Sequence, residues 1–200
     1  MTKDYNIHEK SKQRVRDHAE VFTPKHIVDK MCDMVPEHVW KDPTFLLLEP
    51  TCGTGNFLVA MLQKRIDNGV SVNKALNTLW GMDILVDNIH DSHMRLCEIV
   101  IKKMRAAKKG GPGSQWWLDY MSHYVAIIEN NIFVVKDSLE YMSSGKFDAK
   151  KFVFSDPTGN DNVLSDKEQQ HILDNILTRY NKLRHNKSTP TNDDIISMFI

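Results

Sequence analysis

Residues 44–66, TFLLLEPTCGTGNFLVAMLQKRI, restrict the fold of this chain more than any other stretch. The run TFLLLE is typical of a strand buried on both faces, and NFLVAMLQKRI has the apolar spacing of a helix. Between them, Gly53 and Gly55 form a turn in which backbone without Cβ atoms can approach a ligand and direct amides at it. This order predicts a ligand-binding loop at the carboxyl end of a parallel strand.

Strands and helices alternate along the chain. Apolar runs predict further buried strands at 79–84, 132–135 and 151–155. Apolar spacing predicts helices over 25–35, 56–66, 71–79, 86–109 and 167–184. The segment 114–131 is read either as a helix or as an excursion that packs Trp116 and Trp117 against the core. The alternation predicts a mostly parallel α/β sheet with ligands at the carboxyl ends of its strands.

Two predicted helices begin at residues that favour a helix start. Thr23 is expected to cap the first of these helices, because its hydroxyl can accept from free amides and Pro24 suits the first helical position. Ser71 is expected to cap the helix over 71–79 in the same way.

The glycine turn lacks the residues that two common nucleotide loops require. A dinucleotide loop has a third glycine for close helix-to-strand packing, and Leu58 stands at that position. The lysine and hydroxyl residue of a phosphate-binding loop are also absent. NAD, ATP and GTP are therefore disfavoured, and the turn indicates a nucleoside ligand with little or no phosphate.

Acidic residues end three of the predicted strands: Glu49, Asp83 and Asp137. Parallel strands bring these residues to one rim of the sheet. A carboxylate after the second strand can accept both ribose hydroxyls, and a later one can accept an adenine amino group. The acidic rim also favours a cationic amine or sulfonium. Capping of the following helices is the alternative role for each acid.

The motifs EVFTPKHIVDKM, LLLEPTCGTGNFL, LWGMDI, VVKDSLE and FVFSDPTGN, in this order, resemble the S-adenosylmethionine-dependent DNA adenine-N6 methyltransferases that carry Phe-Thr-Pro before the cofactor loop. The resemblance covers about residues 18–160 and implies a Rossmann-like class I methyltransferase fold, here with part of the sheet missing. It implies that Thr23 and Pro24 touch the methionine end of the cofactor, Asp83 the ribose and Asp137 the adenine amine. The implied cofactor-binding residues are Phe22, Thr23, Pro24, Glu49, Pro50, Cys52, Gly53, Gly55, Asn56, Asp83, Ile84, Asp137 and Ser138.

The resemblance places the catalytic loop at Asp156, Pro157 and Thr158. In the family, an Asn or Asp, two prolines and an aromatic residue receive a flipped adenine and accept its amine hydrogens on a side-chain oxygen and a backbone carbonyl. Here Thr158 and Gly159 replace the second proline and the stacking ring, a loss of about 1–3 kcal/mol of base binding. A plain turn is the alternative for SDPTGN. Transfer to a protein glutamine amide shares this loop but fits the Thr-Pro element less well.

We expect three segments: a polar amino-terminal segment at 1–22, the S-adenosylmethionine-binding domain at 23–185, and a linker with a short apolar tail at 186–200. About 40 residues follow the catalytic loop, fewer than the rest of the sheet and a DNA-recognition region need. The chain is then a fragment, a subunit completed by a partner, or a reduced homologue. The last alternative is a catalytically impaired methyltransferase homologue that acts as a regulatory or structural subunit with a protein partner, in a restriction-modification or phage context.

Composition sets the remaining limits. The 26 basic and 26 acidic residues cancel, which leaves DNA as a candidate partner without a global positive field. Three cysteines without a close pair indicate a reducing compartment, so we expect a cytoplasmic protein. No apolar run approaches about 18 residues, and no membrane contact is expected. His90, His93 and Cys97 have the spacing of metal ligands on a helix, but no fourth ligand is evident and no metal is expected.

Overall fold

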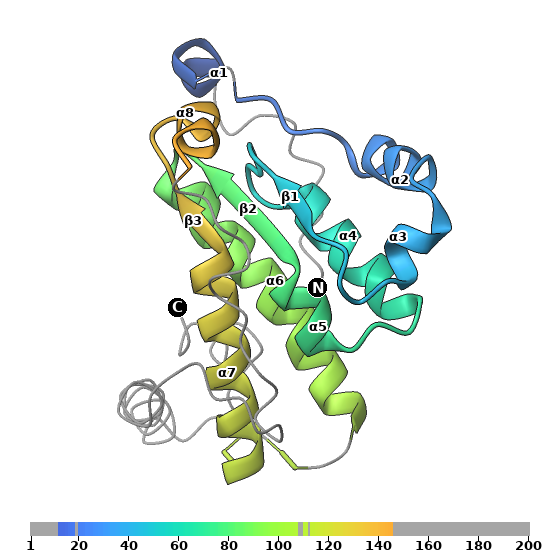
Figure 1. The fold of residues 1–200 in the computed structure, drawn as a ribbon. Helices are drawn as coiled ribbons and strands as arrows, with labels where there is room; N and C mark the ends of the chain where they lie inside the picture. The colour runs from blue at the N-terminus through green and yellow to red at the C-terminus, as the bar shows by residue number, and fades with distance from the viewer. Residues whose placement is uncertain (1–11, 19, 108–109, 112, 146–200) are drawn as a thin grey trace.

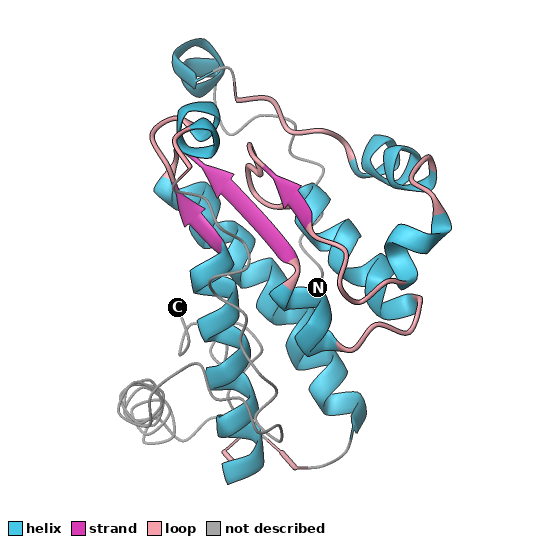
Figure 2. Ribbon diagram, in the orientation of Figure 1, coloured by secondary structure: helices cyan, strands magenta, loops and turns pink. Residues whose placement is uncertain are grey.

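The computed structural model of this chain describes residues 12–18, 20–107, 110–111 and 113–145 (Figure 1). Its centre is a three-stranded parallel sheet formed by β1 (Leu47–Glu49), β2 (Leu79–Asp83) and β3 (Ile132–Val134), in that order (Figure 2). In the register, Leu47 pairs with Leu79, and Gly81 pairs with Ile132. The predicted parallel α/β arrangement is confirmed for the described residues.

Helices form both crossover connections. The connection from β1 to β2 contains α4 (Asn56–Asp67) and α5 (Val72–Asn77), and Ser71 caps α5 as predicted by accepting from the Lys74 amide. The connection from β2 to β3 contains α6 (Val86–Ala107) and α7 (Gln115–Asn131). The helix α6 packs against both α7 and α4, so the crossovers share one apolar core (Figure 1). Such crossovers are what parallel pairing requires.

The segment at 114–131 is resolved as the helix α7. The hydroxyl of Ser114 caps this helix by accepting from the Trp117 amide at 3.3 Å. Trp117 is fully buried, while Trp116 is half-buried and packs against the core. The helical alternative is therefore correct, and the tryptophans still pack as the other alternative expected.

The strand β1 begins at Leu47, three residues later than predicted, because the preceding backbone is used elsewhere. The buried Arg65 guanidinium of α4 donates to the carbonyl oxygens of Phe45 at 2.9 Å and Asp42 at 2.5 Å. Phe45 lies inside the range predicted as strand, and its carbonyl is bonded to this side chain. The short helix α3 (Glu37–Lys41), which precedes this segment, was not predicted.

The amino-terminal part contains α1 (Lys12–His18) and α2 (Lys25–Asp33). The prediction that Thr23 caps α2 is wrong. Pro24 occupies the cap position with φ −60° and ψ 147°, and no side chain caps the helix. The ring fixes φ at a value that suits this extended position, and the Pro24 carbonyl accepts from the amides of Ile27 and Val28.

The close packing of helix on strand that a third glycine of the loop would allow is here made possible by a glycine in β2. The Leu58 side chain is fully buried between α4 and the sheet. A Cβ atom at Gly81 would lie 2.9 Å from Leu58 Cδ1 and 3.2 Å from Ile132 Cδ1. The close approach of helix and strand is thus made by Gly81 in the strand, while Leu58 fills the space from the helix.

The last described element is α8 (Ser138–Ser143), which follows β3. The predicted strand at 151–155, the helix at 167–184, the catalytic-loop residues and the tail at 186–200 lie outside the described residues. The proposed segment boundaries and the Rossmann-like class stay predictions. No helix in the described ranges has both the length and the apolar character needed to cross a membrane.

Candidate functional site

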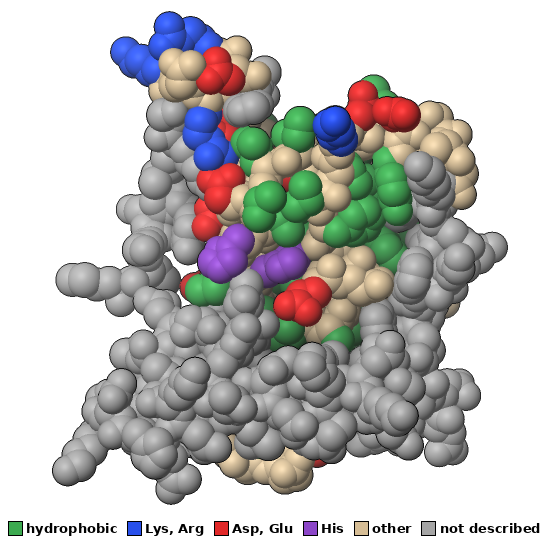
Figure 3. Space-filling model, turned by 90° about the vertical axis from the view of Figure 1, so that its left-hand side faces the viewer, with side chains coloured by type: hydrophobic (Ala, Val, Ile, Leu, Met, Phe, Trp, Pro, Cys, Tyr) green, Lys and Arg blue, Asp and Glu red, His purple; other side chains and the backbone are tan. Residues whose placement is uncertain are grey.

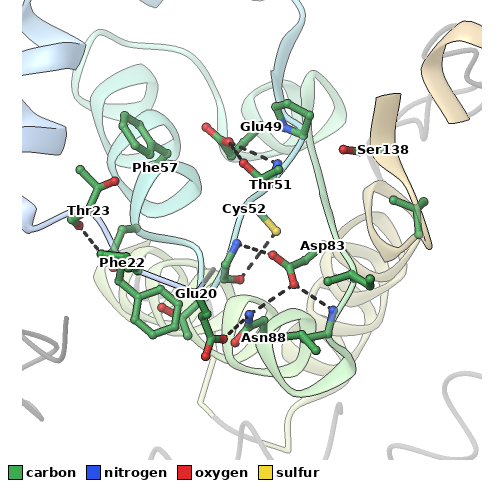
Figure 4. Close-up of a pocket in the computed structure, with 18 of the residues that line it drawn as sticks. Glu20, Phe22, Thr23, Glu49, Thr51, Cys52, Phe57, Asp83, Asn88 and Ser138 are labelled. Carbon is green, nitrogen blue, oxygen red and sulfur yellow. Dashed lines mark hydrogen bonds between the residues drawn. The ribbon is translucent and has the colours of Figure 1, made fainter. Parts of the chain in front are cut away.

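A cavity of about 660 Å³ lies at the carboxyl ends of the three strands (Figure 4). This volume falls within the range of about 300–1,000 Å³ that is usual for small-molecule pockets. Every predicted cofactor-binding residue lines it except Pro24 and Gly55. The lining residues are Glu20, Val21, Phe22, Thr23, Glu49, Pro50, Thr51, Cys52, Gly53, Thr54, Asn56, Phe57, Asp83, Ile84, Leu85, Asn88, Val135, Lys136, Asp137, Ser138 and Leu139.

Both glycines of the turn have backbone conformations that favour glycine. Gly53 has φ +53° and Gly55 has φ +84°. A Cβ atom at Gly55 would lie 2.8 Å from the Ser92 hydroxyl and 3.3 Å from Ser92 Cα, so the turn approaches α6 closely there. The Ser92 hydroxyl also donates to the Gly53 carbonyl at 2.9 Å. Gly55 therefore serves the packing of the turn on α6 rather than the cavity wall.

Asp83 joins the end of β2 to the glycine turn. Its Oδ2 atom accepts from the Gly53 amide at 2.9 Å. Its Oδ1 atom accepts from the Leu85 amide at 2.9 Å and from Asn88 Nδ2 at 3.2 Å. A carboxylate has about four acceptor positions, so these three bonds leave about one for a ligand. The prediction that Asp83 takes both ribose hydroxyls is thereby narrowed to one.

Glu49 presents a carboxylate with unused acceptor capacity. Its Oε1 atom accepts from the Thr51 amide and hydroxyl, both at the long distance of 3.4 Å (Figure 4). Burial raises the pKa of Glu49 above its usual value, and the two bonds from Thr51 oppose that shift. A half-buried carboxylate with weak partners, such as Glu49, is stabilised by an incoming cation.

Asp137 has the capping role that was left open for the strand-end acids. Its Oδ1 atom accepts from the Glu140 amide at 2.9 Å and caps α8. The residue is exposed and lines the cavity. Capping uses one carboxylate oxygen, and the other can accept from a ligand, so the two predicted roles are compatible.

Cys52 is a buried structural residue of the turn. Its amide donates to the Met82 carbonyl at 2.8 Å, which extends the contact between the turn and β2. Burial, together with the charge of Asp83, raises the pKa of the Cys52 thiol to about 12. The thiol stays protonated at neutral pH and is a poor nucleophile.

Sequence reasoning missed Glu20, Asn88 and Arg95. Arg95 of α6 donates to Asn56 Oδ1 at 2.7 Å and to the Thr54 carbonyl at 2.6 Å. Asn56 in turn donates to the Thr23 carbonyl at 2.8 Å, which ties the amino-terminal segment to the turn. Glu20 lies within the EVFTP stretch and was a recognisable candidate, whereas no motif marked Arg95 or Asn88.

Exposed apolar side chains border the cavity. Ile84 after β2 is 51% exposed, Leu139 of α8 is 75% exposed, and Val21 of the amino-terminal segment is 63% exposed. Figure 3, turned by 90° from Figure 1, shows hydrophobic side chains gathered on one face of the molecule. Apolar side chains around a polar floor suit a flat ring system with polar substituents.

The histidines and cysteine of α6 do not converge on a metal. His93 is buried, and its Nε2 atom lies 2.7 Å from the Ile132 carbonyl oxygen; burial lowers the pKa of this imidazole. Cys97 is buried in the core, while His90 is exposed. Within the described ranges, no group of three or more His, Cys, Asp or Glu side chains is placed to hold a metal ion.

No family model, curated protein or solved structure matches this chain. The site is therefore interpreted from its geometry. It combines a glycine turn, carboxylates from three strand ends and an apolar border. This arrangement can bind a cation at Glu49 and a hydroxylated or amino-bearing ring near Asp83 and Asp137.

Proposed function

We propose that this cavity binds S-adenosylmethionine, and that the chain is a DNA adenine-N6 methyltransferase-type protein of Rossmann-like class I fold. The observation that carries the proposal is the convergence of Glu49, Asp83 and Asp137 with the glycine turn on one cavity. These residues follow three strands, span 88 positions from first to last (137 − 49), and were selected from the sequence by their positions at predicted strand ends and by the motif order.

The glycine turn and Glu49 form the methionine end of the proposed site. The α-amino group of the cofactor is a cation, which offsets the cost of burying the Glu49 carboxylate. The start of α4, where Gly55 is the cap and no side chain satisfies the first amides, would hold the cofactor's carboxylate group. The positive amino group of the cofactor is thus paired with Glu49, and its negative carboxylate group with the amino end of α4.

The ends of β2 and β3 form the adenosine end. Ile84 and Leu139 are exposed apolar side chains of about the size needed to contact an adenine ring. Asp83 offers its remaining acceptor position to one ribose hydroxyl. Asp137 offers the carboxylate oxygen that does not cap α8 to the adenine amine.

The proposed reaction is methyl transfer to the exocyclic amine of adenine in DNA, with Asp156 and the Thr158 carbonyl as acceptors of the amine hydrogens. A second candidate is a non-catalytic regulatory or structural subunit that binds a protein partner. It is favoured by Thr158 and Gly159, which stand where the second proline and stacking ring are expected.

Methylation assays with labelled cofactor and DNA of mixed sequence distinguish the methyltransferase from the non-catalytic subunit. The assay compares the natural chain with the double variant Thr158→Pro/Gly159→Tyr. Methylation by the natural chain contradicts the second candidate.

Calorimetric titration with S-adenosylmethionine tests the binding proposal. We expect one site per chain, competition by S-adenosylhomocysteine, and no competition by NAD or ATP. A folded sample that shows no heat of binding at high micromolar cofactor overturns the proposal.

A further inference from the structure

An arginine outside the cavity holds one of the cavity walls. Arg14 of α1 forms a two-pronged ion pair with Glu20, with Nη2 to Oε1 at 2.6 Å. The same guanidinium contacts Asp87 at the start of α6, with Nη1 to Oδ2 at 2.6 Å and Nη2 to Oδ1 at 3.1 Å. These two carboxylates raise the pKa of Arg14, so the cation is always present. Arg14 thus links the amino-terminal segment to α6.

Hydrogen bonds continue from this ion pair to the glycine turn. Asn88 Nδ2 donates to Glu20 Oε1 at 2.8 Å and to Asp83 Oδ1 at 3.2 Å. Asp83 Oδ2 then accepts from the Gly53 amide at 2.9 Å. Figure 4 shows Glu20, Asn88 and Asp83 in this arrangement at the floor of the cavity. Arg14 is therefore connected to the turn by an unbroken polar network.

Residues 20–23, which we call the strap, form one wall of the cavity. The Phe22 ring packs on the turn, because a Cβ atom at Gly53 would lie 3.2 Å from its Cδ1 and Cε1 atoms. The Thr23 carbonyl accepts from Asn56 at 2.8 Å. At the other end of the strap, Glu20 is only 8% exposed and is anchored by Arg14 and Asn88.

We propose that Arg14 is a positioning residue for cofactor binding: without lining the cavity, it holds Glu20 and the strap in the place where the cofactor needs a wall. This inference rests on the proposed function. Without Arg14, the Glu20 carboxylate, which is only 8% exposed, loses its two-pronged ion pair, and removing one partner of such a pair away from water is strongly unfavourable. Loss of Arg14 therefore releases the strap from the Glu20 end. The position of the strap against the cavity and the binding of the cofactor are then thermodynamically linked, so that each favours the other.

The test compares Arg14→Ala, Arg14→Lys and Arg16→Ala in the full chain by calorimetric titration with S-adenosylmethionine. Arg16 is the matched control, since it lies on the same helix, is exposed and donates to Gln13 at 3.0 Å. We expect Arg14→Ala to weaken binding about tenfold, within the usual range of coupling between sites. Arg14→Lys keeps the charge without the two-pronged geometry and is expected to restore part of the affinity. Arg16→Ala is expected to bind as the natural chain does.

Hydrogen exchange of the amides at 20–23 separates positioning from general stability. In the natural chain and in Arg16→Ala, saturating S-adenosylhomocysteine should slow exchange there. In Arg14→Ala the ligand-free exchange should be faster, while exchange within α4 stays unchanged. Affinity within twofold of the natural chain in Arg14→Ala, or faster exchange throughout the molecule, overturns the inference. Absence of binding by the natural chain overturns the proposed function, and the inference with it; equal binding by both overturns the inference alone.

Discussion

The two sides of the cavity are built in different ways. On one side, the glycine turn is joined to β2 through Asp83, to α6 through Ser92, and to Arg95 through the Thr54 carbonyl. On the other side, the end of β3 leads into α8, which has no buried residue. Asp137 on that side makes its hydrogen bond within its own helix.

The comparison shows that the same residue type at the end of a strand can have different structural consequences. Asp83 accepts from Leu85 and Asn88, which follow it closely in the chain, and also from the Gly53 amide, 30 positions away in the glycine turn. Asp137 accepts from one amide three residues away. The turn side is therefore fixed by tertiary contacts before a ligand arrives, and the α8 side is fixed mainly by local structure. The predictions below test this contrast.

The largest effect is expected at Gly55. Gly55→Ala places a Cβ atom 2.8 Å from the Ser92 hydroxyl in a backbone of φ +84°, which should cost about 2–5 kcal/mol of unfolding free energy. Gly145→Ala, next to α8, is the control because it has φ +70° and no atom of the described residues within 4 Å, so the expected loss is the conformational cost of about 1 kcal/mol. Urea denaturation measures both. Equal losses in the two variants would refute the close packing of the turn on α6.

Glu49→Gln should have opposite effects on stability and binding. Burial raises the pKa of Glu49, so the folded state disfavours the ionised form. The contribution of this carboxyl to stability is complete below the ordinary glutamate pKa and is lost as the pH rises through the higher pKa of the folded protein. The amide variant should thus melt higher than the natural chain at pH 7–8, with the difference vanishing near pH 4. Its affinity for S-adenosylmethionine should fall more than about tenfold. Unchanged affinity would remove Glu49 from the site.

Asp83→Asn and Asp137→Asn compare the two sides directly. Asparagine at 83 cannot accept on both side-chain atoms, so one of its present donors loses its partner at a cost of about 1–3 kcal/mol. Asparagine at 137 is still a good helix cap, and stability should change by less than about 0.5 kcal/mol. Thermal melts at pH 7.5 measure both variants. A larger loss of stability in Asp137→Asn than in Asp83→Asn would mean that the α8 side, and not the turn side, is fixed by tertiary contacts.

The smallest effect is expected in the reactivity of Cys52. Its pKa of about 12 keeps the thiol protonated at pH 8, and the side chain is buried. Alkylation of the folded protein, read by peptide mass spectrometry, should be more than about tenfold slower at Cys52 than in guanidinium. Rapid labelling in the native state would mean that the turn opens in the free protein.

Several features of the fold were readable from the sequence for local reasons. The apolar runs located β2 and β3, and Ser71 identified the start of α5. Other features were not readable. The strand β1 begins later than its apolar run predicts, and Arg65 of α4 donates to the carbonyl of Phe45 in the part that is not strand. The actual cap of α2 also differed from the expected Thr23.

The candidate site shows the same division. Predicted strand ends, and then the motif order, selected Glu49, Asp83 and Asp137, which line one cavity because parallel strands end on one side of a sheet. Motif order did not select Asn88, Glu20 or Arg14, because their importance comes from contacts between segments far apart in sequence. The roles of Asp156, Pro157 and Thr158 stay predictions.

The sequence by itself determined the glycine turn, the alternation of strands and helices, and the acidic strand ends, because each depends on residues close together in the chain. Tertiary structure alone decided that Gly55 serves packing against Ser92 and that Gly81 makes room for Leu58. It also decided that the Gly53 amide, 30 positions away, occupies Oδ2 of Asp83. Close packing and hydrogen bonding depend on contacts between residues that are far apart in the sequence. Local sequence patterns do not predict these contacts.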